Sequence, residues 1–345
     1  MEENRETLRL RAEVVEDVLG AARILREGGT VAFPTETVYG LGADALSSAA
    51  VERIFVAKGR PHWDPLIVHV SDEMMLLRVA ELSRDVGARA RRLMEAFWPG
   101  PLTLLLPRTA AVPDLVTAGR SSVGVRMPGN ETARELIRRA GVPVAAPSAN
   151  RFGRTSPTCA AHVLEDLDGR IDAVLDGGPA MVGVESTVLD VCEWPMLIYR
   201  PGAVTIEMIA GVVSEVRMFE AGERTAVPES LPSPGVGLRH YAPRARLVLV
   251  RGTAEEMMFA LRSVIDREAG VRVGVMLPLG WEGREVFAVY EWGDWTDGDA
   301  LARRMFDGLR TLDEVGAEVI VCPLPAGGGM GDALRDRLEK AARSL

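Results

Sequence analysis

Residues 58–69 read KGRPHWDPLIVH and join the end of a predicted helix to a predicted strand. Upstream, apolar residues over 51–55 recur at helical spacing behind a pair of serines (47–48), which predicts a helix that ends near Lys58. Downstream, PLIVHV (65–70) is a short apolar run of strand length. A helix that leads within a few residues into a buried strand is typical of an α/β fold.

Other short apolar runs predict further strands in the first 200 residues, with helical patterns between several of them. These runs are TVAF (30–33), LTLLLP (102–107), VGVRM (123–127), PVAAP (143–147), DAVLD (172–176) and the strand that opens within GVESTVLD (183–190). We therefore predict an α/β fold with a mixed sheet.

At 345 residues the chain is long for one core and suits two domains. Periodicity fades over 211–243, where proline and glycine accumulate, and an α/β alternation with a mostly parallel sheet then returns. We predict a first domain over 1–210, an interdomain linker over 211–243 and a small α/β domain over 244–345.

The composition is that of a globular protein, with 47% hydrophobic residues and a formal net charge of −9. This balance offers no overall basic field for non-specific nucleic-acid binding. The first ten residues are too polar for a signal peptide, and no apolar run reaches membrane-spanning length. Three separated cysteines lack metal-binding spacing and favour reduced thiols, so we expect a cytoplasmic protein.

Of the 40 lysines and arginines, only Lys58 and Lys340 are lysines. Lysine offers phosphate a compact point charge, whereas arginine offers a planar fork of donors. Lys58 with Arg60, Arg126 and Arg200 is predicted to form an anion-binding cleft from separate loops. Chance retention of the lysine is the alternative.

Two polar loops follow predicted strands, where an open α/β sheet places its ligands. FPTETVYGLGADA (33–45) supplies hydroxyls for a carboxylate or an amine, and APSANRFGRTSPT (146–158) precedes a helix whose N-terminus suits phosphate oxygens. Turn and helix capping by the same residues is the alternative. YRPG (199–202) is expected to place Arg200 in a sharp turn.

Several known motifs are missing from the sequence. It has no phosphate-binding P-loop, no nucleophile elbow and no zinc-protease motif. PAGGGMGDAL (325–334) precedes a predicted helix but lacks dinucleotide-binding spacing, which favours a flexible loop.

Taken in order, FPTETVYGLGADA, KGRP with PLIVH, WPGPLTLLL, VGVRMP, PSAN with SPT, ESTV and RPG resemble the YrdC/Sua5 family of threonylcarbamoyl-AMP synthases. The motifs span about residues 15–205, and PGVGLRHYAP with the α/β tail resembles the longer, two-domain Sua5 form. The resemblance implies a YrdC-like twisted mixed sheet with helices around a deep cavity, and a small Rossmann-like C-terminal domain.

The resemblance also implies a nucleotidyltransferase activity. L-threonine, bicarbonate and ATP give threonylcarbamoyl-AMP and pyrophosphate, with Mg²⁺ accompanying the nucleotide. A separate transferase complex would move the threonylcarbamoyl group to the adenosine beside the anticodon of tRNAs that read A-starting codons. Direct tRNA binding by this chain is expected to be weak or absent.

The family's functional positions carry over motif by motif. Catalysis is implied for Lys58, Arg60 and Asn150. Threonine binding is implied for Thr37, His69, Arg126, Ser148 and Ser186, with Arg126 facing the carboxylate. ATP binding is implied for Arg60, Asp64, Ser122, Ala146, Ser156, Arg200 and Tyr241, with Ala146 acting through its backbone and Tyr241 closing as a gate. No residue is assigned to a metal.

Asp64 departs from the asparagine or histidine that many family members have at this position. Its negative charge would repel a triphosphate unless the carboxylate points to the ribose, the base or Mg²⁺.

Two other functions stay open at this level. One is a carbamoyl-adenylate-forming module like that of hydrogenase-maturation carbamoyltransferases, although the chain has neither their zinc-finger nor their acylphosphatase segments. The other is double-stranded RNA binding, which the acidic composition disfavours.

Overall fold

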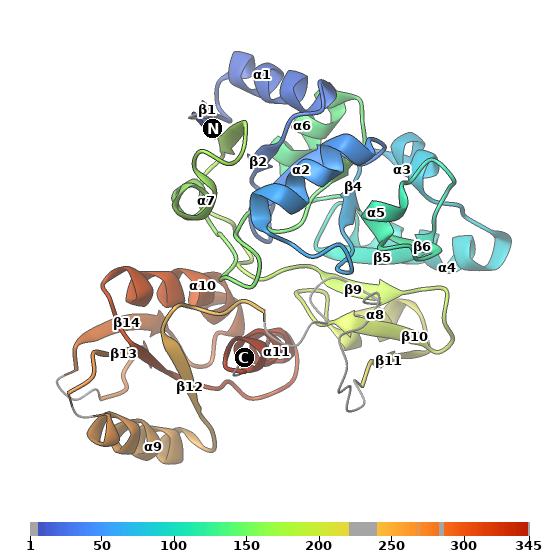
Figure 1. The fold of residues 1–345 in the computed structure, drawn as a ribbon. Coiled ribbons are helices and arrows are strands. Elements are labelled where there is room, and N and C mark those ends of the chain that lie inside the picture. The colour runs from blue at the N-terminus through green and yellow to red at the C-terminus, as the bar shows by residue number, and fades with distance from the viewer. Residues whose placement is uncertain (1–5, 221–239, 269, 283–285, 344–345) are drawn as a thin grey trace. The chain divides into compact units, whose positions relative to one another are not determined.

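The computed structural model describes residues 6–220, 240–268, 270–282 and 286–343. The chain divides into two compact units, each with its own sheet (Figure 1). The first comprises Met1–Phe152, Pro157–Met181 and Glu185–Gly237, and the second comprises Gly153–Ser156, Val182–Val184 and Leu238–Leu345. The boundaries 1–210, 211–243 and 244–345 stay a prediction, and residues 221–239 of the expected linker lie outside the described residues.

The first unit holds a mixed sheet with the order β1-β8-β2-β3-β7-β4-β6-β5-β9-β10-β11. Its strands are β1 (Leu8–Arg11), β2 (Val31–Phe33), β3 (Gly40–Asp44), β4 (Ile67–His69), β5 (Leu102–Pro107), β6 (Ser122–Arg126), β7 (Val144–Ala145), β8 (Ala173–Asp176), β9 (Thr187–Asp190), β10 (Met196–Arg200) and β11 (Val216–Met218). Its helices are α1 (Val15–Arg26), α2 (Ser48–Lys58), α3 (Glu73–Val79), α4 (Arg84–Phe97), α5 (Asp114–Thr117), α6 (Glu131–Ala140), α7 (Ala160–Leu167) and α8 (Ile206–Val212).

The second unit has a parallel sheet of order β12-β15-β13-β14 with three helices in its described part. Its elements are β12 (Arg246–Val250), α9 (Ala254–Arg267), β13 (Val273–Pro278), β14 (Ala288–Gly293), α10 (Gly298–Glu314), β15 (Val319–Pro323) and α11 (Met330–Ala341). The mixed α/β fold and the smaller, Rossmann-like parallel sheet are therefore confirmed.

Helix α2 shows how local sequence fixes the element that carries Lys58. The Ser47 side chain accepts a hydrogen bond from the Ala50 N–H at the N-cap, and Gly59 ends the helix with φ of 63°. Glycine pays no Cβ penalty in that left-handed conformation. The predicted cap and the predicted end near Lys58 are both confirmed.

The first-unit core is a continuous cluster between the sheet and its helices, with Phe33, Leu41, Val68, Leu104 and Val125 among its fully buried members. The expectation of a sharp turn at Arg200 was wrong, because Arg200 is the last residue of β10. Strand β3 was also missed, since its GLGAD sequence has little β propensity and owes its conformation to pairing with β2 and β7.

None of the helices in the described part of the chain is both long and apolar enough to span a membrane.

Gly42 in β3 provides a test of this packing. A Cβ there would lie 2.7 Å from both the Phe33 ring and a Val144 methyl group. We expect Gly42→Ala to lower the free energy of unfolding by about 1–3 kcal/mol through overpacking, measured by urea denaturation. The control Gly20→Ala, within α1 and with no atom within 4 Å of the added Cβ, should be neutral or raise stability by about 0.5–1 kcal/mol. Equal effects at both positions would contradict this account of the core.

Candidate active site

Four predicted site cations are buried in the first unit. Their exposed fractions are 2% for Lys58, 7% for Arg60, 3% for Arg126 and 4% for Arg200. Buried charge is costly unless partners compensate for lost hydration, so such residues are seldom found inside without a reason. The four cations are therefore not scattered over the surface.

Sheet topology brings several predicted residues to one edge. Strands β4 and β6 are parallel, so His69 and Arg126 end them side by side and are register partners. Strands β5 and β9 begin at that edge and β10 ends there, which adds Ser186, just before β9, and Arg200. Since β4 has only three residues, the edge where it begins is only about 10 Å away.

Lys58, the last residue of α2, forms hydrogen bonds with the loop that follows β7. Its Nζ lies 2.5 Å from the backbone oxygens of both Ser148 and Asn150, to which it donates hydrogen bonds. The Ser148 hydroxyl donates to Asn150 Oδ1 at 2.5 Å. Burial, with repulsion from Arg60, holds the pKa of Lys58 well below its usual value. The three predicted residues thus form one connected group.

Arg60 is paired with Asp64. The Arg60 Nη2–Asp64 Oδ1 distance is 3.0 Å, and the guanidinium also donates to the backbone oxygens of Asp64 at 3.1 Å and Pro65 at 2.7 Å. Burial raises the pKa of Asp64, while the charges of Arg60, Lys58 and Arg200 oppose that rise. Asp64 is thus the counter-charge of Arg60 and lies in the field of three of the buried cations. Pairing with Arg60 therefore explains why a carboxylate is tolerated at position 64, which the sequence alone did not show.

Arg126 is held by the loop between β2 and β3. Its Nη1 donates to Thr37 Oγ1 at 3.0 Å, and its Nη2 lies 2.6 Å from Glu36 Oε1. Burial opposes ionisation of Glu36, but Arg126 and the backbone N–H groups nearby hold its pKa below the usual value. Glu36 was not among the predicted site residues. An acidic residue beside Thr37 in an otherwise uncharged loop was the available signal.

Ser186 and Arg200 are also in contact. Arg200 donates to the Ser186 hydroxyl at 3.1 Å and to its backbone oxygen at 3.0 Å. The Ser186 and Thr103 hydroxyls are 2.8 Å apart. Thr103 was missed, although it is the single hydroxyl residue of the apolar run LTLLLP.

Of the four other predicted ATP residues, two lie at the edge where β4 and β6 begin, the same edge as Asp64. Ser122 begins β6, at the opposite end of that strand from Arg126, and the Ala146 N–H donates to the Ile67 oxygen at 2.8 Å within the sheet. Ser156 and Tyr241 belong to the second unit. Their part in the site therefore rests on the resemblance.

Tyr241 is buried within the second unit. Its ring lies 4.2 Å from the His240 ring and 5.8 Å from the Phe306 ring, centroid to centroid, and the Arg337 guanidinium lies 5.4 Å from its centroid. Its φ of 65° is rare for a non-glycine residue. The gating role stays a prediction.

Among the residues that the structure describes, no group of three or more His, Cys, Asp or Glu side chains could hold a metal ion. Two carboxylates beside the buried cations, Glu36 and Asp64, are paired with arginines.

A mixed α/β sheet with four buried cations is typical of proteins that bind anionic ligands. Comparison with known families is more specific. A Sua5–YciO–YrdC family model described as telomere recombination matches residues 23–202. A second model, described as the C-terminal domain of threonylcarbamoyl-AMP synthase, matches residues 204–343.

Individual relatives agree with both models. The chain is 43% identical to threonylcarbamoyl-AMP synthase of Pyrococcus abyssi over 93% of each chain, and 41% identical to that of Bacillus subtilis over 93% of this chain and 92% of the relative. The crystal structure of P. abyssi Sua5 complexed with L-threonine has a TM-score of 0.90 at 41% identity over 97% of both chains. A P. abyssi Sua5 variant with a histidine and a tyrosine replaced by alanine also gives 0.90, at 40% identity over 97% of this chain and 96% of the variant.

The chain therefore belongs to the Sua5/YrdC family of threonylcarbamoyl-AMP synthases, in the two-domain Sua5 form. This membership favours an enzyme of the nucleotidyltransferase type over a carbamoyltransferase module or an RNA-binding protein.

The buried His69 imidazole makes stability depend on pH. Burial, with repulsion from Arg126, lowers the pKa of His69 to about 3. The unfolded chain takes up this proton near pH 6.5 and the folded chain does not, so stability is lost as pH falls below about 6.5. We expect a loss of about 2 kcal/mol from about pH 7 to pH 5, measured by urea denaturation.

His69→Gln should remove this part of the pH dependence, whatever its effect on absolute stability. The control His62→Gln, at a side chain that is 61% exposed, should keep it. A slope unchanged in His69→Gln would show that another group is responsible.

Proposed function

We propose that this chain condenses L-threonine, bicarbonate and ATP into threonylcarbamoyl-AMP, releasing pyrophosphate. The burial of Lys58, Arg60, Arg126 and Arg200 carries the proposal, together with family membership. Both reactants are anions: a carbamate must approach the α-phosphate of a triphosphate. Preorganised cations lower such a barrier by positioning the anions and stabilising their charge, without a covalent enzyme intermediate.

Lys58 and Arg60 would face the triphosphate and carbamate oxygens. The depressed pKa of Lys58 reflects burial and repulsion between these two cations, which an incoming polyanion would relieve. Asp64 would keep Arg60 oriented while its own charge is offset by three cations. This arrangement supports nucleotide binding by Arg60 and Arg200 and a catalytic role for Lys58 and Asn150.

Arg126 would bind the threonine carboxylate, with Thr37 and the neutral His69 beside it. Glu36 pairs with one arm of the guanidinium and fixes its orientation. Ser148 and Ser186 would supply hydroxyls to the amine and side chain of the amino acid. The related P. abyssi Sua5 forms a crystalline complex with L-threonine, which supports this substrate.

Mg²⁺ would be held by nucleotide phosphates rather than by a dedicated carboxylate cluster, in keeping with the described side chains. We also propose a cytoplasmic location and transfer of the product's threonylcarbamoyl group to tRNA by a separate complex.

The direct test incubates the protein with ATP, Mg²⁺, labelled bicarbonate and a panel of amino acids. Mass analysis should find one labelled adenylate, formed with threonine. An adenylate that forms equally with every amino acid, or label in a carbamoyl adenylate without threonine, would refute the proposal.

Lys58 and Arg60 can be tested by substitution. We expect Lys58→Ala and Arg60→Ala each to reduce threonine-dependent pyrophosphate release by about 100-fold or more, since each loses a preorganised charge. Lys58→Arg should fail as well, because a guanidinium does not fit between two backbone oxygens each 2.5 Å from Nζ. Arg138→Ala, with a side chain 65% exposed on α6, is the control that should keep full turnover. Normal turnover in either alanine variant would show that the site is misassigned.

Arg126 is predicted to govern threonine rather than ATP. In Arg126→Lys a point charge replaces the fork that contacts Thr37 and Glu36, so we expect the KM for threonine to rise about tenfold or more. The KM for ATP should change by about twofold or less. Both KM values can be measured by steady-state kinetics with each substrate varied in turn. An equal rise in the KM for threonine and the KM for ATP would contradict the assignment of Arg126 to threonine.

A further inference from the structure

The second unit contains a topological switch point. From β12 the chain crosses over β15 to reach β13, whereas from β14 it returns in the opposite direction to β15. Crossovers between parallel strands are right-handed, so this reversal sends α9 and α10 to opposite faces of the sheet. Helix α11 packs against α10 and shares its face (Figure 1).

Neighbouring strands β12 and β15 therefore send their loops apart, one to α9 and the other to α11. In open α/β sheets this divergence opens a ligand-binding crevice at the carboxyl ends of the strands. A cavity of about 430 Å³ lies there, lined by residues that include Arg251, Thr253, Trp295, Leu324 and Arg335. Its size is within the ordinary range for small-molecule sites.

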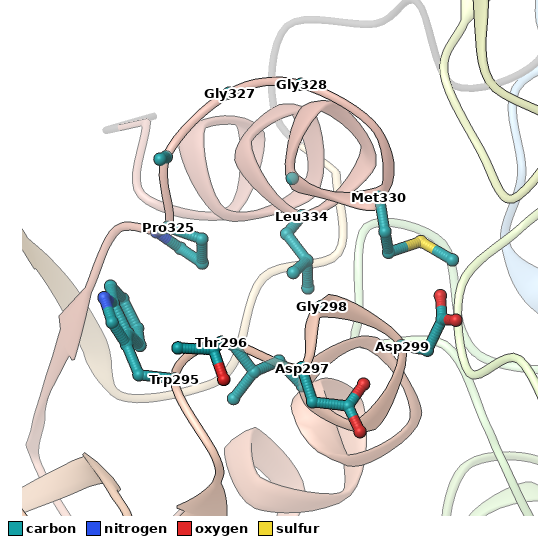
Figure 2. A pocket seen from close by; sticks show the side chains of 13 residues that line it. Trp295, Thr296, Asp297, Gly298, Asp299, Pro325, Gly327, Gly328, Met330 and Leu334 are labelled. Carbon is teal, nitrogen blue, oxygen red and sulfur yellow. The ribbon is translucent and has the colours of Figure 1, made fainter. Parts of the chain in front are cut away.

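A second cavity of about 560 Å³ adjoins it, and both are lined by Trp295 and Ala326. Figure 2 shows the second cavity between the glycine loop that precedes α11 and the start of α10. Asp297 and Asp299 border it on the α10 side, and Gly327 and Gly328 lie on the opposite side. The stretch PAGGGMGDAL, predicted to be only a flexible loop, thus forms one wall of a cavity.

Two guanidiniums line the first cavity. Arg251 Nη1 and Arg335 Nη2 lie 2.9 Å and 3.4 Å from the same oxygen of Glu339. Two guanidiniums share this carboxylate, and because each has five N–H donors, donors remain on both for an anion. Near the same cavity, the Glu256 carboxylate accepts a hydrogen bond from the Thr253 N–H at 2.7 Å. Arg335 also donates to the Pro325 oxygen at 2.9 Å, which positions it at the cavity wall.

Trp295 supplies a flat apolar wall common to both cavities. Its ring lies 5.1 Å from the Trp281 ring and 6.1 Å from the Trp292 ring, between centroids, so its position is fixed by packing. Trp292 is fully buried and donates to the Leu301 oxygen at 2.8 Å, which anchors the cluster. Such an aromatic wall suits the stacking of a planar ring.

We propose that these adjoining cavities form a nucleotide-binding site of the second unit, for a nucleoside monophosphate. The phosphate would meet Arg251 and Arg335, and the base would stack near Trp295. Ribose hydroxyls or an exocyclic amine would donate to Asp297 and Asp299. Arg251 and Arg335 are the cations that line the two cavities, and they match the charge of one phosphate rather than that of three. The proposal is independent of the reaction assigned to the first unit.

The test uses the full chain with its six tryptophans replaced by 5-fluorotryptophan. The Trp295 signal is assigned by ¹⁹F NMR with Trp295→Phe, and AMP is then titrated. We expect this signal to shift saturably, and to do so equally in Arg60→Ala, whose first-unit site is disabled. Arg251→Ala, which loses only a partly exposed ion pair, should raise the midpoint about tenfold.

Arg267→Ala, at the far end of α9, is the matched control and should titrate like the unsubstituted protein. The site would be refuted if the Trp295 signal did not move, or if its shift had the same midpoint in Arg251→Ala. A shift produced equally well by inorganic phosphate would overturn the nucleoside part of the proposal. A shift lost in Arg60→Ala would assign the effect to the first unit.

Discussion

The cost of burying positive charge governs the first unit. Lys58, Arg60, Arg126 and Arg200 are all withdrawn from water, and the protein compensates each one differently. Lys58 has two backbone oxygens, Arg60 has Asp64, Arg126 has Glu36 with Thr37, and Arg200 has Ser186. Glu36 and Asp64 pair with two of these cations, whereas Lys58 and Arg200 donate to neutral oxygen atoms. The structure of the unit and its proposed chemistry therefore depend on the same buried cations.

In the proposed site, a short piece of sheet joins the residues assigned to threonine to those assigned to the nucleotide. Strand β4 has three residues, with His69 and the Arg126 group at one end and the segment that carries Asp64 at the other. The two groups are therefore held about 10 Å apart by backbone hydrogen bonds rather than by flexible side chains. A rigid separation of this kind is what a reaction between two bound anions requires.

The second unit places its charged side chains differently from the first. Its first cavity results from strand order, because the reversal of direction after β14 separates the loops of β12 and β15. Arginines line the first cavity, Trp295 is common to both cavities, and Asp297 and Asp299 line the second. The first unit takes its charge from buried residues, whereas the second presents charge at the carboxyl edge of a parallel sheet.

The sequence by itself determined the α/β class and the bounds of α2, because apolar periodicity and capping residues are local properties. Its ordered motifs also identified the family and singled out Lys58, Arg60, Arg126 and Arg200 as site residues. It did not reveal that Glu36 pairs with Arg126, that Asp64 offsets Arg60 or that Thr103 meets Ser186. It also misjudged Arg200 as a turn residue, and it did not reveal that the glycine-rich loop before α11 borders a cavity. Those features depend on strand order and register, which bring distant residues together, and only the tertiary structure decides them.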